Sequence, residues 1–101
     1  MAIVAISTAP AGIAGTSMSE YVAEAEKVLR ADGRVKYQLG AMFTTIEGEL
    51  HVCMEVCEKM HMALIDAGAP RVGTVIKIDD RRDKPTSMEA KVKAVEDKLA
   101  S

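Results

Sequence analysis

The sequence predicts an α+β fold in which two helices cover one face of a four-stranded antiparallel sheet and a further helix follows at the C-terminus. Apolar residues switch several times between a period of two and a period near 3.6. Glycine or proline stands at most of these switches. The resulting order, βαββαβ with an extra C-terminal helix, is that of a ferredoxin-like two-layer sandwich. Residues 1-101 are expected to form one domain, since this length suits a single core.

The boundaries of the expected elements follow from turn and capping residues. Ser17 and Glu20 have the spacing of a capping box, which starts a helix, and Gly33 is placed to end it. A second box runs from Thr86 to Glu89. The expected strands are residues 2–8, 35–39, 42–46 and 72–78, with a small-residue loop at 9–16, a hairpin turn at 40–41, and helices at 17–33, 48–67 and 86–99.

The first strand predicts self-association. It carries Ile3 and Ala5 on one face and Val4 and Ile6 on the other. Right-handed crossovers place both main helices on the same face of the sheet, so they cover only one of these surfaces. The second surface is too apolar to face water and needs the last helix or a second copy to cover it. We therefore expect a homo-oligomer.

Charge and cysteine content limit the classes of partner. The net charge is −2, which gives no basic surplus for a nucleic-acid partner. Residues 1–19 carry no charge, but they lack a basic start and are too short an apolar run for a membrane segment. Cys53 and Cys57 lie one helical turn apart, where a disulfide would strain the helix, so free thiols and a cytoplasmic location are expected.

Metal and catalytic motifs are weak. Cys53, Cys57 and His61 share one helix face, but about 12 Å of axial rise separates the first from the last. The cysteines are therefore expected to be core residues. His51 and His61 have no nucleophile or carboxylate assigned to them by any motif, and the loop at 9–16 lacks a phosphate-binding glycine pattern. No metal, cofactor or catalytic residue is predicted.

Two polar stretches remain open to more than one interpretation. Thr44, Thr45 and Glu47 stand where a strand leads into a helix, and their oxygens suit a polar heterocycle. Threonine is also simply a good strand former, and Glu47 would then be a solvated charge. The charged stretch 77–83 contains Lys77, Asp79, Arg81 and Arg82. It is expected to be an ion-paired strand end at a subunit interface, with a pocket wall or a phosphate clamp as alternatives.

Five stretches together resemble the small thiamine-binding proteins of the YkoF-like type. They are AIVAIST at 2–8, SMSEYV at 17–22, KYQL at 36–39, TTIEG at 44–48 and KIDDRRD at 77–83. The resemblance covers residues 2 to 99. It implies a ferredoxin-like subunit, assembly into a homodimer or homotetramer through the sheets, and binding of thiamine or its hydroxymethylpyrimidine part without catalysis.

The resemblance also implies a set of ligand-binding residues. Glu47 would bond a ring nitrogen or balance the thiazolium, and Thr44 or Thr45 would meet the amino group. Tyr37 would supply an aromatic wall, and Ser7 with Thr8 would complete the pocket. The alternative functions are a structural or regulatory homo-oligomer without a small ligand, and a small phosphate-handling enzyme that uses Arg81 and Arg82.

Overall fold

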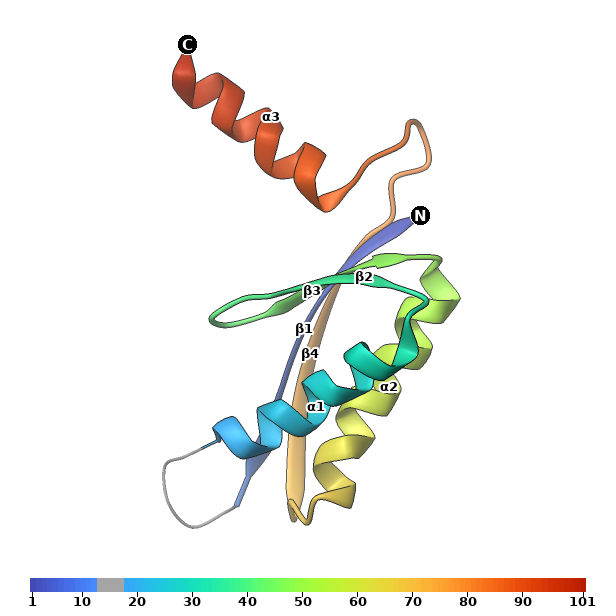
Figure 1. Cartoon of the computed structure of the whole chain (residues 1–101), viewed down its shortest axis with the longest axis vertical. Coiled ribbons are helices and arrows are strands. Elements are labelled where there is room, and N and C mark those ends of the chain that lie inside the picture. Colours follow the sequence, from blue (N-terminus) through green and yellow to red (C-terminus); the bar gives the residue numbers. More distant parts are fainter. Residues whose placement is uncertain (13–17) are drawn as a thin grey trace.

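A computed structural model describes residues 1–12 and 18–101 and confirms the ferredoxin-like fold (Figure 1). The strands join into one antiparallel sheet of order β2-β3-β1-β4, with β1 in contact with both β3 and β4. Helices α1 and α2 lie side by side on one face of the sheet, and α3 projects beyond it. The elements are β1 (Ala2–Ala11), α1 (Ser19–Asp32), β2 (Lys36–Leu39), β3 (Thr44–Gly48), α2 (Leu50–Asp66), β4 (Arg71–Asp79) and α3 (Met88–Ala100).

The core lies between the sheet and the two helices α1 and α2. Alternate residues of the central strands, such as Val4 and Ile46, are fully buried there. They pack with Leu29 of α1 and with α2 residues that recur at helical spacing. Cys53 and Cys57 are free thiols within this core, as expected. Burial raises the pKa of the Cys57 thiol to about 11, which keeps it protonated at neutral pH.

The first strand is longer than expected and includes Pro10. The prediction that a loop begins at residue 9 is wrong, because β4 pairs with β1 as far as Ala11. Proline fits there since β3 pairs with β1 only up to Ile6, so the strand has one free side at this point. Ser17, the proposed start of a capping box, lies outside the described residues. Met18 occupies the N-cap position of α1 without a side-chain hydrogen bond.

The hairpin strand β3 begins two residues later than expected. The turn occupies residues 40–43. Its two ends lie so close together that a Cβ atom at Gly40 would lie 2.4 Å from the carbonyl oxygen of Phe43. Only glycine fits such a contact. Thr44 and Thr45 still alternate to opposite faces, because a later start of the strand does not change the alternation along it.

The capping box predicted at the last helix is displaced by one residue. Ser87, and not Thr86, is the N-cap residue, and its hydroxyl accepts a hydrogen bond from the Ala90 amide at 3.0 Å. Glu89 forms an ion pair with Lys36 of β2 instead of closing a box. The helix α3 therefore starts at the hydroxyl that caps it, one residue after the predicted position.

Candidate ligand-binding site

The two sheet faces divide the five residues that the sequence suggested as ligand contacts. Strand register places Thr44 opposite Leu39, and Tyr37 opposite Ile46. The buried Ile46 and Thr44 belong to the face covered by α1 and α2. Thr45 and Glu47 alternate to the opposite face, which we call the open face, and Ser7 of β1 follows the same alternation. These five residues therefore do not all lie on one face of the sheet.

Glu47 is engaged by the C-terminal helix. Its Oε1 atom accepts a hydrogen bond from the Met88 backbone amide at 2.7 Å, which is the first amide of α3. A carboxylate at this position accepts a hydrogen bond from a free amide and interacts favourably with the positive end of the helix dipole. Lys91 of α3 forms an ion pair with Asp79 at the end of β4, and this contact lowers the pKa of the Asp79 carboxyl. Both contacts hold the first turn of α3 over the open face.

A hollow of about 510 Å³ lies between the open face and the first turns of α3, and we call it the open-face hollow. Its polar wall contains Thr45 and Gln38, which face each other in register across β2 and β3. Lys77 and Asp79 also line it, so these two residues of the charged stretch do form part of a pocket. Ile3, Ile78 and Val92 are among its apolar neighbours.

The rest of the charged stretch is an ion-paired strand end. Arg81 donates to Asp83 at 2.6 Å, and Arg82 donates to Asp80 at 2.6 Å. The expectation of internal pairing is thereby confirmed. Each guanidinium already has a carboxylate beside it, an arrangement poorly suited to clamping a phosphate.

A second hollow, of about 240 Å³, lies on the helix-covered face beneath the turn of the β2–β3 hairpin, and we call it the hairpin hollow. Thr44 lines it, and its hydroxyl donates to Oε1 of Glu26 in α1 at 2.5 Å. The other oxygen of that carboxylate, Oε2, is buried and has no hydrogen-bond partner among the described residues. Buried polar atoms in native proteins are almost always hydrogen-bonded to protein, water or ligand. This oxygen is therefore an open acceptor.

The remaining wall of the hairpin hollow is apolar and aromatic, with hydroxyls at its edge. Phe43 and Met42 come from the turn, and Met60 comes from α2. The Thr8 hydroxyl of β1 lies on this face, whereas Ser7 borders the hollow although its side chain alternates to the open face. Glu26 is the single charged residue among the described residues that line the hollow. Aromatic surface, hydroxyls and one carboxylate together suit a small heterocycle that carries N–H donors or a positive charge.

Sequence reasoning missed Glu26, although the chain contains a signal for it. Glu26 follows Val22 by four residues and precedes Leu29 by three, so it lies within the apolar stripe of α1. A carboxylate in such a stripe lies at the edge of the core, where it needs a partner. The strand β3 supplies a partner, Thr44, for one of the two carboxylate oxygens.

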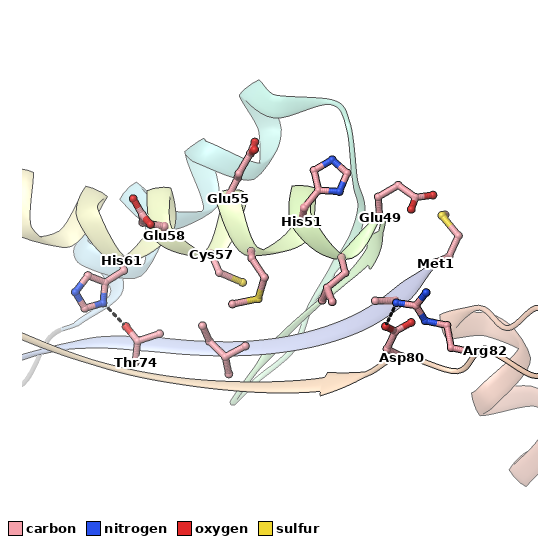
Figure 2. Close-up of a pocket in the computed structure, with 14 residues that line it drawn as sticks. Met1, Glu49, His51, Glu55, Cys57, Glu58, His61, Thr74, Asp80 and Arg82 are labelled. Atoms are coloured by element: carbon pink, nitrogen blue, oxygen red, sulfur yellow. Dashed lines mark hydrogen bonds and ion pairs between the residues drawn. The ribbon is translucent and has the colours of Figure 1, made fainter.

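A third hollow, the α2–β4 groove, holds about 960 Å³ between α2 and the edge strand (Figure 2). At one end His61 reaches across to Thr74, with 2.6 Å between Nδ1 and Oγ1. At the other end Asp80 and Arg82 form their ion pair. Within residues 1–12 and 18–101, no three histidine, cysteine or acidic residues are grouped to hold a metal ion. Over the same residues, no helix is long and apolar enough to cross a membrane.

A sequence model of thiamine-binding proteins matches residues 4–96 of this chain. The chain belongs to this thiamine-binding protein family. Within the family it is 45% identical over 98 residues to UPF0045 protein YqgV of Bacillus subtilis, with 94% of each chain covered. The resemblance that the sequence motifs indicated is thereby confirmed.

Solved structures of related proteins share the fold of this family member. One is a domain of unknown function, DUF77, from Bacillus cereus, with a TM-score of 0.81 and 35% identity, covering 90% of this chain and 86% of that one. Another, from Thermotoga maritima, is provisionally assigned to thiamine biosynthesis or salvage. It has a TM-score of 0.77 and 26% identity over 93% of this chain and 97% of that one.

Proposed function

We propose that this family member binds thiamine or its hydroxymethylpyrimidine part, without catalysing a reaction on it, and that the hairpin hollow receives the pyrimidine ring. The family assignment supports the ligand class. The main support for this site is the buried Oε2 atom of Glu26, which lacks a hydrogen-bond partner among the described residues. An amino group on the ring donates to that oxygen, and the cost of burying an unpaired acceptor is thereby removed.

The size and charge of the hairpin hollow support one ring and not two. Its volume of about 240 Å³ lies below the roughly 300–1,000 Å³ of pockets that enclose drug-sized ligands. The pyrimidine therefore enters against Phe43, and the thiazolium ring stays at the mouth. The negative charge of Glu26 favours a ligand that is a cation.

This proposal gives the predicted contact residues different roles. Thr44 orients the Glu26 carboxylate through its hydrogen bond, and Ser7 contributes to the wall through β1. Tyr37 does not line the hairpin hollow. Thr45 and Glu47 belong to the open face, where Glu47 holds α3. Glu47 is therefore the natural control for Glu26, since both are glutamates with one hydrogen-bonded oxygen.

Isothermal titration with thiamine, hydroxymethylpyrimidine and thiamine phosphate tests the proposal. Hydrogen bonds to charged groups contribute about 1.5–3 kcal/mol, so Glu26→Gln should weaken binding roughly ten- to hundredfold. Glu47→Gln should leave the affinity within about threefold of the wild-type value. Absence of binding up to millimolar ligand would overturn the function. Loss of binding in Glu47→Gln alone would move the site to the open face.

We also propose that the protein works as a homodimer or homotetramer in the cytoplasm, with a second copy covering the open face. Val75 on that face is 59% exposed, and the α3 residues Val95 and Leu99 are 59% and 79% exposed. Helix α3 projects beyond the sheet (Figure 1). An apolar stripe on such a helix is a typical contact surface. The same observation favours the alternative of a structural oligomer without a ligand. Val95→Glu should lower the mass measured by light scattering, and an unchanged mass would exclude α3 from the interface.

A further inference from the structure

A chain of hydrogen bonds connects the hairpin hollow to the α2–β4 groove. Thr8 lines the hairpin hollow and is paired in register with Thr74 on the edge strand. Their hydroxyl oxygens are 2.7 Å apart. The Thr74 oxygen is also 2.6 Å from Nδ1 of His61, and both of these residues line the groove (Figure 2). The Thr74 hydroxyl therefore connects the Thr8 hydroxyl to the imidazole ring of His61.

The direction of these hydrogen bonds depends on the charge of His61. An unprotonated ring nitrogen is a stronger acceptor than a hydroxyl oxygen, so in the neutral tautomer that carries its proton on Nε2, Thr74 donates its proton to Nδ1. Thr8 then donates to Thr74, and the oxygen of Thr8 offers only lone pairs to the hollow. When both ring nitrogens carry protons, His61 donates to Thr74 and Thr74 donates to Thr8. The proton of Thr8 is then left to point into the hollow.

We propose that the chain Thr8–Thr74–His61 determines ligand specificity in the hairpin hollow by making Thr8 a hydrogen-bond acceptor while neutral His61 carries its proton on Nε2. The proposal rests on the proposed function of that hollow. Thr8 and the open oxygen of Glu26 are then two acceptors at the same hollow. They select a pyrimidine that presents an amino group and reject one that presents a carbonyl oxygen in its place. Protonation of His61 turns Thr8 into a donor and weakens binding of the amino ligand.

Other charged groups near His61 do not take part in the chain. The groove is lined by the α2 residues Glu58, Glu55 and His51 and by Glu49 at the N-cap of that helix. Past the end of β4 it is lined by Asp80 and Arg82, with Met1 at the same end. Glu55 is paired with Arg34, and Asp80 with Arg82. Cys57 lines the groove as a neutral thiol. The strands β1 and β4 present Thr8 and Thr74 to this end, so His61 is the one member of the chain with an ionisable side chain. Histidine is the side chain that changes charge between pH 5 and 8.

The test compares hydroxymethylpyrimidine with its analogue that carries an oxo group in place of the amino group, at pH 8 and pH 5.5. At pH 8 the wild type should prefer the amino ligand at least tenfold, and its affinity for that ligand should fall about tenfold at pH 5.5. Thr74→Val keeps the strand shape but breaks the chain, and it should reduce the pH effect to less than threefold. His51→Gln, outside the chain, should behave as the wild type. Protonation of the ligand itself is common to all three proteins and cancels in the comparison.

Equal pH effects in wild type and Thr74→Val would overturn the inference while leaving ligand binding intact. Failure of the wild type to bind either pyrimidine at pH 8 would instead overturn the proposed function. A measurement without ligand separates the two cases. Nitrogen-15 spectra of the imidazole rings should show His61 protonated on Nε2 and unprotonated on Nδ1 at pH 8. A proton on Nδ1 at that pH would contradict the stated direction of the chain.

Discussion

Replacing Thr44 by valine tests the contact that orients the Glu26 carboxylate. Valine keeps the β-branched shape of threonine and suits a strand, but it removes the hydroxyl. Thr44 is 5% exposed, and its hydroxyl is the partner of Glu26 Oε1. Since Oε2 is already without a partner among the described residues, the substitution leaves the whole carboxylate unsatisfied in the unliganded protein.

The expected cost follows from this loss. A hydrogen bond to a charged group contributes about 1.5–3 kcal/mol, and the lower end applies because Glu26 is only half-buried. We expect Thr44→Val to reduce the free energy of unfolding by about 1.5 kcal/mol. For a domain of this size, each kcal/mol lowers Tm by about 4–8 °C, which gives a decrease of roughly 6–12 °C.

Urea unfolding at one fixed protein concentration is the assay, since the stability of an oligomer depends on concentration. A double-mutant cycle with Glu26→Met isolates the pair, because the double variant carries neither polar partner. The coupling energy should be about 1 kcal/mol or more. A loss below about 0.5 kcal/mol in Thr44→Val, or effects of the two substitutions that simply add, would refute the reasoning.

Three further substitutions test other parts of the fold. Glu47→Ala removes the acceptor of the Met88 amide and should speed hydrogen exchange at the first turn of α3; unchanged exchange would show that Glu47 does not hold this helix. Arg34 holds the pKa of Asp32 at about 2, below the value near 3.9 of an unfolded chain. The wild type should therefore lose stability as the pH falls from about 4 to about 2, and Asp32→Asn should show a smaller loss over that window in acid titration. Leu29→Ala empties a fully buried core position and should cost about 2–5 kcal/mol in urea unfolding, whereas a cost under 1 kcal/mol would contradict the core assignment.

The fold could be predicted from the sequence because its signals are local. Alternation in the strands and the stripe of α2 assigned each side chain to a face, and these assignments survived a two-residue error in the start of β3. The errors at Pro10 and at Thr86 have different causes. At Pro10 the distant strand β4 extends β1 beyond its local signal, whereas at Thr86 two adjacent hydroxyl residues could cap α3 and the second, Ser87, does so.

The candidate site depended on contacts that no local pattern contains. Thr44 was identified from its chemistry, but its partner Glu26 lies 18 residues away on a helix. Glu47 was predicted as a ligand contact, and the structure gives it a backbone partner 41 residues later. Thr8 and Thr74 are 66 residues apart and meet only because β1 and β4 pair. The residue types indicated a polar pocket near the hairpin. Which residues line that pocket depends on the tertiary arrangement and could not be predicted from local patterns.

The most direct measurement is a crystal structure of the protein soaked or co-crystallised with hydroxymethylpyrimidine. We expect the ring beneath the hairpin turn, against Phe43, with its amino nitrogen about 2.7–3.2 Å from Oε2 of Glu26. A ring bound on the open face beside Thr45 and Lys77, with the Glu26 carboxylate untouched, would contradict this expectation.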